Sequence, residues 1–334
     1  MERGPVTGPV QVKSEVHFQT LASPSQIAWD YVTSVLPPSK VIYKAREELA
    51  RFARAGDSYT SEFIEPQAAS SILLAVHPCD LHGILVLERT LRGTFTDPWY
   101  DAARKATVIV GLNCRHVGPL CFCASFGTGP FYAEWMGQGP PAGCDLLLTD
   151  LGEAFSVEVM SPEGEELLAD AQSAPASDKD LDSKRRAEVK ARECFTKHLD
   201  TRDLPALLMR NLEHPVWEHV AESRCLSCTN CTMVCPTCYC YDPQDDVSLD
   251  LATISRYRQW DSCQDYHFAE VHFGNFRSTR KSRLRQFICH KLSYWVPQHG
   301  CFGCVGCGRC IRWCPTGIDL TEIAAEIRRG ESAL

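Results

Sequence analysis

The sequence has no apolar run long enough to cross a membrane, and its first residues lack the apolar core of a secretory signal. The longest apolar stretches, residues 72–76 and 108–112, fall far short of the roughly 18 residues that span a bilayer. Positions 1–10 contain no apolar signal segment. These absences predict a soluble, cytoplasmic protein without a membrane partner.

Basic side chains are scarcer than acidic ones, 34 against 42, so the formal net charge is −8. Proteins that bind nucleic acid usually present a basic face, and we therefore expect no nucleic-acid partner. The chain has 334 residues, of which 44% are hydrophobic. This length and composition predict a folded protein with a substantial core and two domains.

Cysteine is missing from the first 78 positions, yet the chain contains 19 cysteines in all. An odd number cannot all pair as disulfides, and the cysteine content lies below the roughly 8 to 10% that marks a small disulfide scaffold. Five cysteines lie between Cys79 and Cys144, and thirteen lie between Cys225 and Cys314. Metal binding is therefore the first explanation to test.

This distribution predicts two unlike domains. Residues 1–160 are expected to form an α/β domain with a mostly parallel sheet, and residues 161–200, rich in charged and small side chains, a solvated connector. Residues 201–334 are expected to form an α-rich, ferredoxin-like domain for two clusters, with an insertion at 241–300. We expect this insertion to pack around the clusters.

Within the first domain, hydrophobic periodicity predicts alternating strands and helices. Apolar spacing over residues 22–55 predicts two helices, broken at Pro37 and Pro38. The following expected elements are a strand at 71–76, a helix at 80–91, a short helix ending at 105, and strands at 107–112, 145–148 and 155–159.

Two cysteine motifs dominate the second domain. Both have the spacing C-x2-C-x2-C-x3-C followed by proline, and their members are Cys225, Cys228, Cys231, Cys235 and Pro236, then Cys304, Cys307, Cys310, Cys314 and Pro315. In two-cluster ferredoxins the first three cysteines of each motif hold one [4Fe-4S] cluster, and the fourth ligates the other. Zinc sites also use CxxC pairs, but a zinc ribbon has no use for a third cysteine at this spacing or for the closing proline.

The exchange of fourth ligands predicts two ligand sets. Cluster 1 is expected on Cys225, Cys228, Cys231 and Cys314, and cluster 2 on Cys304, Cys307, Cys310 and Cys235. All iron positions would then be held by protein, which favours electron transfer over substrate binding.

A third set of cysteines lies in the first domain: Cys79, Cys114, Cys121 and Cys123. Cys79 follows the first expected parallel strand and Cys114 the second, so both should lie at the carboxyl edge of the sheet, where open α/β sheets bind ligands. The turn at Gly118 and Pro119 could return the other two thiols to this edge. A third [4Fe-4S] cluster is the preferred interpretation; zinc, a redox-active pair at Cys121 and Cys123, and buried packing thiols remain alternatives.

Seven cysteines receive no ligand role. We expect Cys238, Cys240 and Cys301 to line cluster pockets and the others to be packing thiols, and these are Cys144, Cys194, Cys263 and Cys289.

A basic run carries five positive charges within nine residues, at Arg277, Arg280, Lys281, Arg283 and Arg285. No nucleic-acid-binding motif accompanies it. Two interpretations remain: arginine that offsets anionic clusters, and a docking face for an acidic carrier such as ferredoxin.

Six segments together resemble a known family, the β subunit of cytoplasmic multi-subunit NiFe hydrogenases, also called sulfhydrogenases. This 4Fe-4S dicluster family is related to the A subunit of anaerobic sulfite reductase. The similarity extends over residues 71–327 and rests on His77-Pro-Cys-Asp80, Gly111-Leu-Asn-Cys114, Cys121-Phe-Cys-Ala-Ser-Phe-Gly-Thr-Gly-Pro130, Cys225-Leu-Ser-Cys-Thr-Asn-Cys231, Cys235-Pro-Thr-Cys-Tyr-Cys240 and Gly303-Cys-Val-Gly-Cys-Gly-Arg-Cys310.

The resemblance implies a non-catalytic electron-transfer subunit with several [4Fe-4S] clusters, and it strengthens the case for the third one. It further implies docking to an FAD-containing diaphorase subunit and, through it, to the small and large NiFe hydrogenase subunits, with ferredoxin as a candidate acceptor. Two other functions stay open: the corresponding subunit of an anaerobic sulfite or sulfur reductase, and a zinc-stabilised interaction protein.

Overall fold

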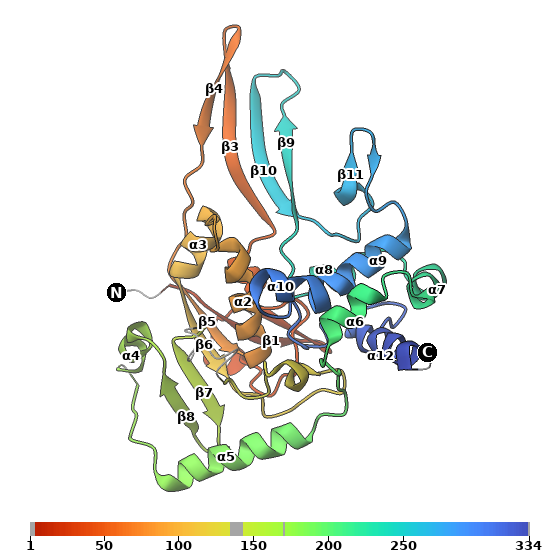
Figure 1. The fold of residues 1–334 in the computed structure, drawn as a ribbon. Helices are drawn as coiled ribbons and strands as arrows, with labels where there is room; N and C mark the ends of the chain where they lie inside the picture. Colours follow the sequence, from red (N-terminus) through yellow and green to blue (C-terminus); the bar gives the residue numbers. More distant parts are fainter. Residues whose placement is uncertain (1–3, 134–142, 170, 333–334) are drawn as a thin grey trace.

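A computed structural model describes residues 4–133, 143–169 and 171–332. Its larger sheet has six strands in the order β2-β1-β5-β6-β7-β8 (Figure 1). Strands β1, β5, β6 and β7 run parallel, and β2 and β8 pair antiparallel at the two edges. The predicted α/β domain with a mostly parallel sheet is therefore confirmed. The strand bounds are β1 Val6–Val12, β2 Glu15–Thr20, β5 Ser71–Val76, β6 Thr107–Leu112, β7 Leu146–Asp150 and β8 Phe155–Val159.

The central strands are short apolar runs because helices cover both faces of the sheet. On one face, Leu73 and Ile109 pack with residues of α2 (Pro78–Leu91) and α3 (Pro98–Lys105). Their neighbours Ile72 and Val110 point to the opposite face, toward α4 (Pro162–Leu168). Proline occupies the first turn of all three helices, where its missing N–H costs no hydrogen bond.

The prediction of two helices in residues 22–55 is wrong over most of its length. The chain forms a 3₁₀ turn, η1 (Pro24–Gln26), a short helix, α1 (Ser39–Ile42), and then strand β3 (Arg46–Ala55). Strand β3 contains good helix formers, but it pairs with β10 (Thr253–Trp260) on one side and β4 (Ser58–Phe63) on the other. This pairing overrides local helix propensity.

A second sheet joins distant parts of the sequence in the order β4-β3-β10-β9. Strand β4 spans Ser58–Phe63, β9 Tyr241–Val247 and β10 Thr253–Trp260. Figure 1 shows these two hairpins projecting together away from the rest of the molecule. The first third of the insertion at 241–300 therefore builds a sheet with the first domain instead of packing around the predicted clusters.

The expected connector contains α4 and a long exposed helix, α5 (Asp178–Glu193), in which only Ala191 is buried. Ser177 and Asp180 form a capping box at its start. The helix is held to the sheet by an ion pair of 2.5 Å between Lys184 and Glu158 of β8. The domain boundaries at 160 and 200 stay a prediction.

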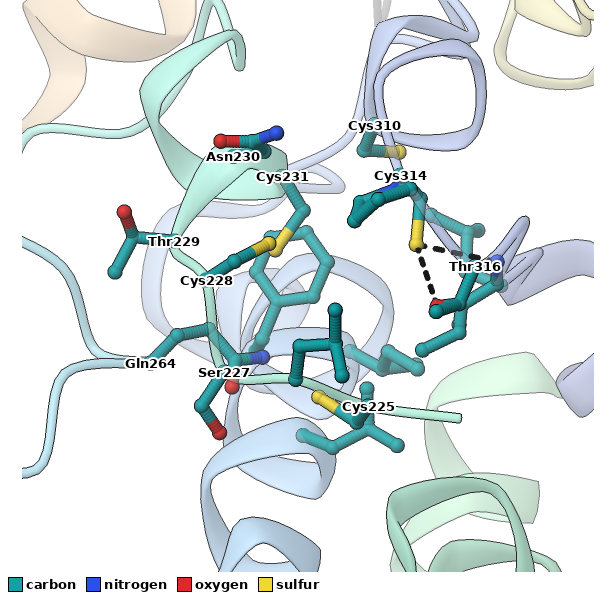
Figure 2. Close-up of a pocket in the computed structure, with 17 residues that line it drawn as sticks. Cys225, Ser227, Cys228, Thr229, Asn230, Cys231, Gln264, Cys310, Cys314 and Thr316 are labelled. Carbon is teal, nitrogen blue, oxygen red and sulfur yellow. Dashed lines mark hydrogen bonds between the residues drawn. The ribbon is translucent and has the colours of Figure 1, made fainter. Parts of the chain in front are cut away.

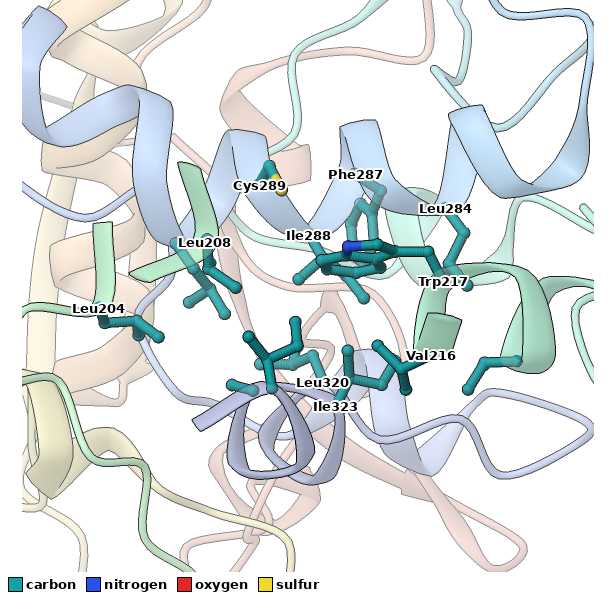
Figure 3. Packing of buried hydrophobic residues seen from close by; sticks show 14 of the residues in the cluster. Leu204, Leu208, Val216, Trp217, Leu284, Phe287, Ile288, Cys289, Leu320 and Ile323 are labelled. Carbon is teal, nitrogen blue, oxygen red and sulfur yellow. The ribbon is translucent and has the colours of Figure 1, made fainter. Parts of the chain in front are cut away.

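The C-terminal part is mostly helical and has its own apolar core around Trp217, Leu208 and Ile288 (Figure 3). Two of its short helices, α8 and α11, begin inside the two cysteine motifs. None of the helices in the described part of the chain is long and apolar enough to span a membrane. The remaining bounds are η2 Cys123–Phe126, α6 Leu204–Arg210, α7 Pro215–Ser223, α8 Asn230–Met233, η3 His267–Ala269, β11 Glu270–Val271, β12 Gly274–Asn275, α9 Arg280–Cys289, the π-helical η4 His290–Tyr294, α10 Trp295–His299, α11 Arg309–Arg312 and α12 Leu320–Ser332.

The two parts of the chain are in close contact at the segment that follows Cys235. Ser39 Oγ donates a hydrogen bond of 3.0 Å to the carbonyl of Pro236, and Lys40 Nζ donates one of 2.8 Å to the carbonyl of Cys238. A Cβ on Gly83 of α2 would lie 2.8 Å from Pro236. Glycine at this position lets α2 rest directly on the proline that closes the first motif.

Candidate metal centres

The predicted ligands of cluster 1 line one pocket (Figure 2). Cys225, Cys228 and Cys231 come from the first motif, and Cys314 comes from the end of the second. Apolar side chains such as Leu284 and Ile318 fill the remaining wall. The pocket thus contains the four cysteines that the exchange of fourth ligands predicts, although their separation in sequence reaches almost 90 positions. Cys310, which the exchange assigns to cluster 2, also lines it.

The predicted ligands of cluster 2 are also neighbours. Burial raises the pKa of Cys310, and the thiols of Cys304, Cys307 and Cys235 raise it further. The hydroxyl of Thr237 lies 3.2 Å from the sulfur of Cys235 and donates a hydrogen bond of 2.7 Å to the carbonyl of Gly303. Thr237, which directly follows Pro236, is therefore bonded to Gly303, which directly precedes Cys304.

The third set lies near the carboxyl edge of the large sheet. Cys79 lies in the first turn of α2, directly after β5, and Cys114 follows β6. Burial raises the pKa of Cys114, and the neighbouring thiols of Cys123 and Cys121 raise it further. Among the groups that raise the pKa of Cys79, after burial and Asp80, are Cys123 and Cys307.

The loop of the third set packs directly on the second motif. The N–H of Phe122 donates a hydrogen bond of 2.8 Å to the carbonyl of Gly306. A Cβ on Gly306 would lie 2.6 Å from the backbone nitrogen of Cys123, and one on Gly308 would lie 2.4 Å from the carbonyl oxygen of Leu120. Both glycines also have positive φ, of 66° and 77°. Glycine is therefore required here by close approach and by backbone conformation alike.

A buried ion pair links the same two regions. The guanidinium of Arg309, between Cys307 and Cys310, donates bonds of 2.6 and 2.7 Å to the carboxylate of Asp80, the neighbour of Cys79. Its Nε donates a further bond of 2.9 Å to the carbonyl of Ser34. Both charged side chains are almost fully buried. Two parallel hydrogen bonds of this kind help to offset the cost of removing both charges from water.

Buried polar groups around the first motif fit an iron-sulfur cluster. Gln264 is 1% exposed, lines the pocket, and has hydrogen-bond partners for neither its amide nitrogen nor its amide oxygen among the described residues. Figure 2 shows its amide group turned toward the cysteines. A buried amide without partners is costly, and a thiolate or sulfide in this pocket would accept its N–H. Cysteine thiols, most of them partly or fully buried, are the donors that [4Fe-4S] clusters use.

The basic run is largely engaged within the chain. Arg280 pairs with Glu222 at 2.6 Å and donates a bond of 3.1 Å to the carbonyl of Cys225, and Arg285 pairs with Glu213 at 2.6 Å. These charges hold α9 against α7 and against the first motif. They give little support to a free basic face for an acidic carrier.

The seven unassigned cysteines divide into buried and exposed ones. Cys240 and Cys263 lie side by side because β9 begins and β10 ends there, and a hydrogen bond from Cys263 lowers the pKa of Cys240 to about 7. Cys144 is buried, and burial raises its pKa to about 12. Cys194 is exposed, at the end of α5. Their lack of a ligand role stays a prediction.

Sequence analysis missed three polar residues of these centres: Gln264, Asp80 as a partner of Arg309, and Lys291. Lys291 is 3% exposed and donates bonds of 2.9 Å to the carbonyl and hydroxyl oxygens of Thr237. Asp80 and Arg309 each stand beside a candidate ligand, which was a usable signal. Gln264 and Lys291 lie in the insertion and are brought to the motifs only by the fold.

Comparison with known proteins supports this arrangement. Residues 224–318 match the family model described as a 4Fe-4S dicluster domain. The whole chain is similar to sulfhydrogenase 2 subunit beta of Pyrococcus furiosus, with 33% identity over 98% of this chain and 94% of that protein. No solved structure matches the chain. The chain therefore belongs to the sulfhydrogenase β-subunit family and is an iron-sulfur electron-transfer subunit with a 4Fe-4S dicluster domain.

Proposed function

We propose that this chain holds three [4Fe-4S] clusters and relays single electrons between a flavin-containing diaphorase subunit and either the NiFe hydrogenase subunits or a terminal acceptor such as ferredoxin. Clusters of this type accept and release one electron at a time. The chain's own contribution is to hold them close together, bury them and set their potentials. The observation that carries the proposal is that cysteines from distant segments lie near one another: Cys314 shares a pocket with the first motif, and the third set lies beside the second motif.

The ligand sets proposed for the dicluster pair follow the exchanged pattern. Cys225, Cys228, Cys231 and Cys314 share one pocket, which supports the first set. The mutual effects of Cys310, Cys304, Cys307 and Cys235 on ionisation support the second set. Thiols that are buried together resist ionisation, so a bound cation is needed to keep them as thiolates.

The third cluster is proposed on Cys79, Cys114, Cys121 and Cys123. Contact between the Phe122 loop and Gly306 supports it, because the third set then lies next to the second motif. The clusters would form a chain of electron carriers in the order cluster 1, cluster 2, cluster 3. Electrons would pass from the dicluster domain into the α/β domain along this line.

Partner exchange is proposed at the first motif. Cys228 is exposed, and its neighbour Leu226 is 61% exposed. An exposed ligand beside an apolar side chain suits electron exchange with a docked protein, because a partner can bury the apolar surface and shorten the electron path. The name of the P. furiosus relative, a sulfhydrogenase subunit, supports partners of the hydrogenase type.

Metal analysis of protein purified without oxygen tests the proposal. Three clusters predict about 12 iron atoms and about 12 acid-labile sulfides per chain, and two clusters predict about 8 of each. Zinc without sulfide would contradict an electron-transfer function. Co-purification of a flavoprotein with NiFe subunits would support the hydrogenase complex, whereas a sirohaem subunit would assign the chain to sulfite reduction.

A further inference from the structure

Two cations of the insertion are buried at the cysteine motifs without a carboxylate partner. They are Arg283 of α9 and Lys291 of η4, which continues α9 directly. Arg283 is 6% exposed and Lys291 is 3% exposed. No acidic side chain of the described residues lies within ion-pair distance of either one. The two residues are eight positions apart on one continuous helical segment.

Lys291 faces the second ligand set. Its ammonium group donates bonds of 2.9 Å to both oxygens of Thr237, and these acceptors are uncharged. The same Thr237 hydroxyl lies 3.2 Å from the sulfur of Cys235 and donates to the carbonyl of Gly303. The charge of Lys291 is thereby fixed between Cys235 and the start of the second motif.

Arg283 faces the first ligand set. It donates bonds of 3.0 Å to the carbonyls of Arg277 and Ser278 and one of 3.3 Å to the hydroxyl of Ser227, between Cys225 and Cys228. Its Nε is buried without a hydrogen-bond partner among the described residues. Every acceptor that Arg283 meets is uncharged.

Other cations on α9 differ from these two because they are paired. Arg280 meets Glu222 at 2.6 Å, and Lys281 meets Glu213 at 3.3 Å. A buried cation without a countercharge is strongly unfavourable, so Arg283 and Lys291 each need an anion nearby. A cluster held by four thiolates carries net negative charge, and reduction adds one more negative charge.

We propose that Lys291 and Arg283 are built-in countercharges, one for each cluster of the pair, and that each raises the reduction potential of its own cluster by stabilising the reduced form. One helix of the insertion would thus set both potentials. Because Lys291 binds Thr237 beside Cys235, a proposed ligand of cluster 2, and Arg283 binds Ser227 among the proposed ligands of cluster 1, the two effects should be separable. This inference rests on the proposed function, since it takes clusters to be bound at the two motifs.

An anaerobic redox titration of the purified holoprotein, followed by electron paramagnetic resonance, tests it. Lys291→Met is expected to lower the potential of one cluster, and Arg283→Met that of a different one. We expect at least a tenfold change in each reduction equilibrium, which is about 59 mV for one electron. Lys281→Met, on the same helix but paired at the surface, is the matched control and should leave both potentials unchanged.

Charge-conserving variants keep the test valid if the methionine variants fail to fold or lose iron. Lys291→Arg and Arg283→Lys should keep iron and sulfide at the wild-type level and both potentials close to wild type. Wild-type potentials in both methionine variants, equal shifts of both clusters in either one, or the full methionine-type shift in a charge-conserving variant would overturn the inference. Wild-type protein without iron and sulfide would instead refute the proposed function, so the two failures are distinguishable.

Discussion

The two cysteine motifs have the same spacing but opposite surroundings. At matching positions, Leu226 of the first motif is 61% exposed while Val305 of the second is 2% exposed, and exposed Asn230 corresponds to fully buried Arg309. The first motif lies at the surface, whereas the second is enclosed between the Phe122 loop and α2. The spacing therefore predicts the ligands, and the residues between them determine whether each motif lies at the surface or in the interior.

The backbone of both motifs uses the same left-handed conformation with different residues. Ser227 and Thr229 have φ of 50° and 67°, and the matching Gly306 and Gly308 have φ of 66° and 77°. In the first motif Ser227 and Thr229 accept the roughly 1–2 kcal/mol that a side chain costs in this region. The second motif has no such freedom, since another loop occupies the space of a Cβ.

The largest expected effect separates the third site from the pair. Cys121→Ser should remove one whole cluster, about four iron atoms per chain, because a neutral hydroxyl does not replace a thiolate ligand. The paramagnetic signals of the dicluster pair should persist. Iron analysis together with electron paramagnetic resonance measures both. Cys194→Ser, at an exposed thiol, is the control; identical spectra in the two variants would reject the third cluster.

A smaller effect is expected from the buried ion pair of the second motif. Asp80→Ala leaves Arg309 buried without its anion, which should lower the free energy of unfolding by about 3–5 kcal/mol. The comparable change at the first motif, Glu222→Gln, removes a partly exposed partner of Arg280 and should cost less than about 1 kcal/mol. Anaerobic urea denaturation of both variants provides the comparison. Equal losses would mean that the two surroundings do not differ in this respect.

The matching left-handed positions give a still smaller effect. Gly308→Ala adds a left-handed conformational cost of about 1–2 kcal/mol and a Cβ that would lie 2.4 Å from the Leu120 carbonyl oxygen. We expect a total loss of about 2–4 kcal/mol. Thr229→Gly, in contrast, relieves the same conformation and should change stability by about 1 kcal/mol or less. Thermal unfolding under anaerobic conditions measures both, and a tolerated Gly308→Ala would show that the Phe122 loop can move away.

Local sequence patterns were enough for the parts of the fold that depend on near neighbours. The apolar run at residues 71–76 and the apolar spacing at 80–91 each predicted the observed element. Strand β3 was mistaken for a helix because its pairing partner, β10, lies about 200 positions later. A two-residue turn at Gly56 and Asp57, which joins β3 to β4, was the available hairpin signal.

In the candidate centres too, some residues can be assigned from local sequence patterns and others only from the fold. Cysteine spacing predicts which thiols should meet, because a ferredoxin-type motif fixes its own loop and the exchange of its last ligand, and these ligand sets stay a prediction. Lys291, Arg283 and Gln264 could not be assigned to the motifs in this way. They lie in the insertion, and only the packing of α9 and of the segment after β10 brings them to the cysteines.

The smallest expected effect concerns Gln264, which gives the first motif a neutral donor in addition to its cation. The hydroxyl of Ser262 accepts a hydrogen bond of 3.0 Å from the backbone N–H of Gln264. The same hydroxyl lies 2.7 Å from the hydroxyl of Thr232, and these contacts fix the backbone beside the pocket. Gln264→Leu should lower the potential of cluster 1 by less than the tenfold step, about 59 mV, because it removes one uncharged N–H donor and no charge. Gln264→Glu should lower it further, since a carboxylate opposes the added electron. In a redox titration, the potential of cluster 1 should fall from glutamine to leucine to glutamate at position 264, while the potential of cluster 2 stays unchanged. A leucine variant with the wild-type potential would place the amide outside hydrogen-bonding reach of the cluster.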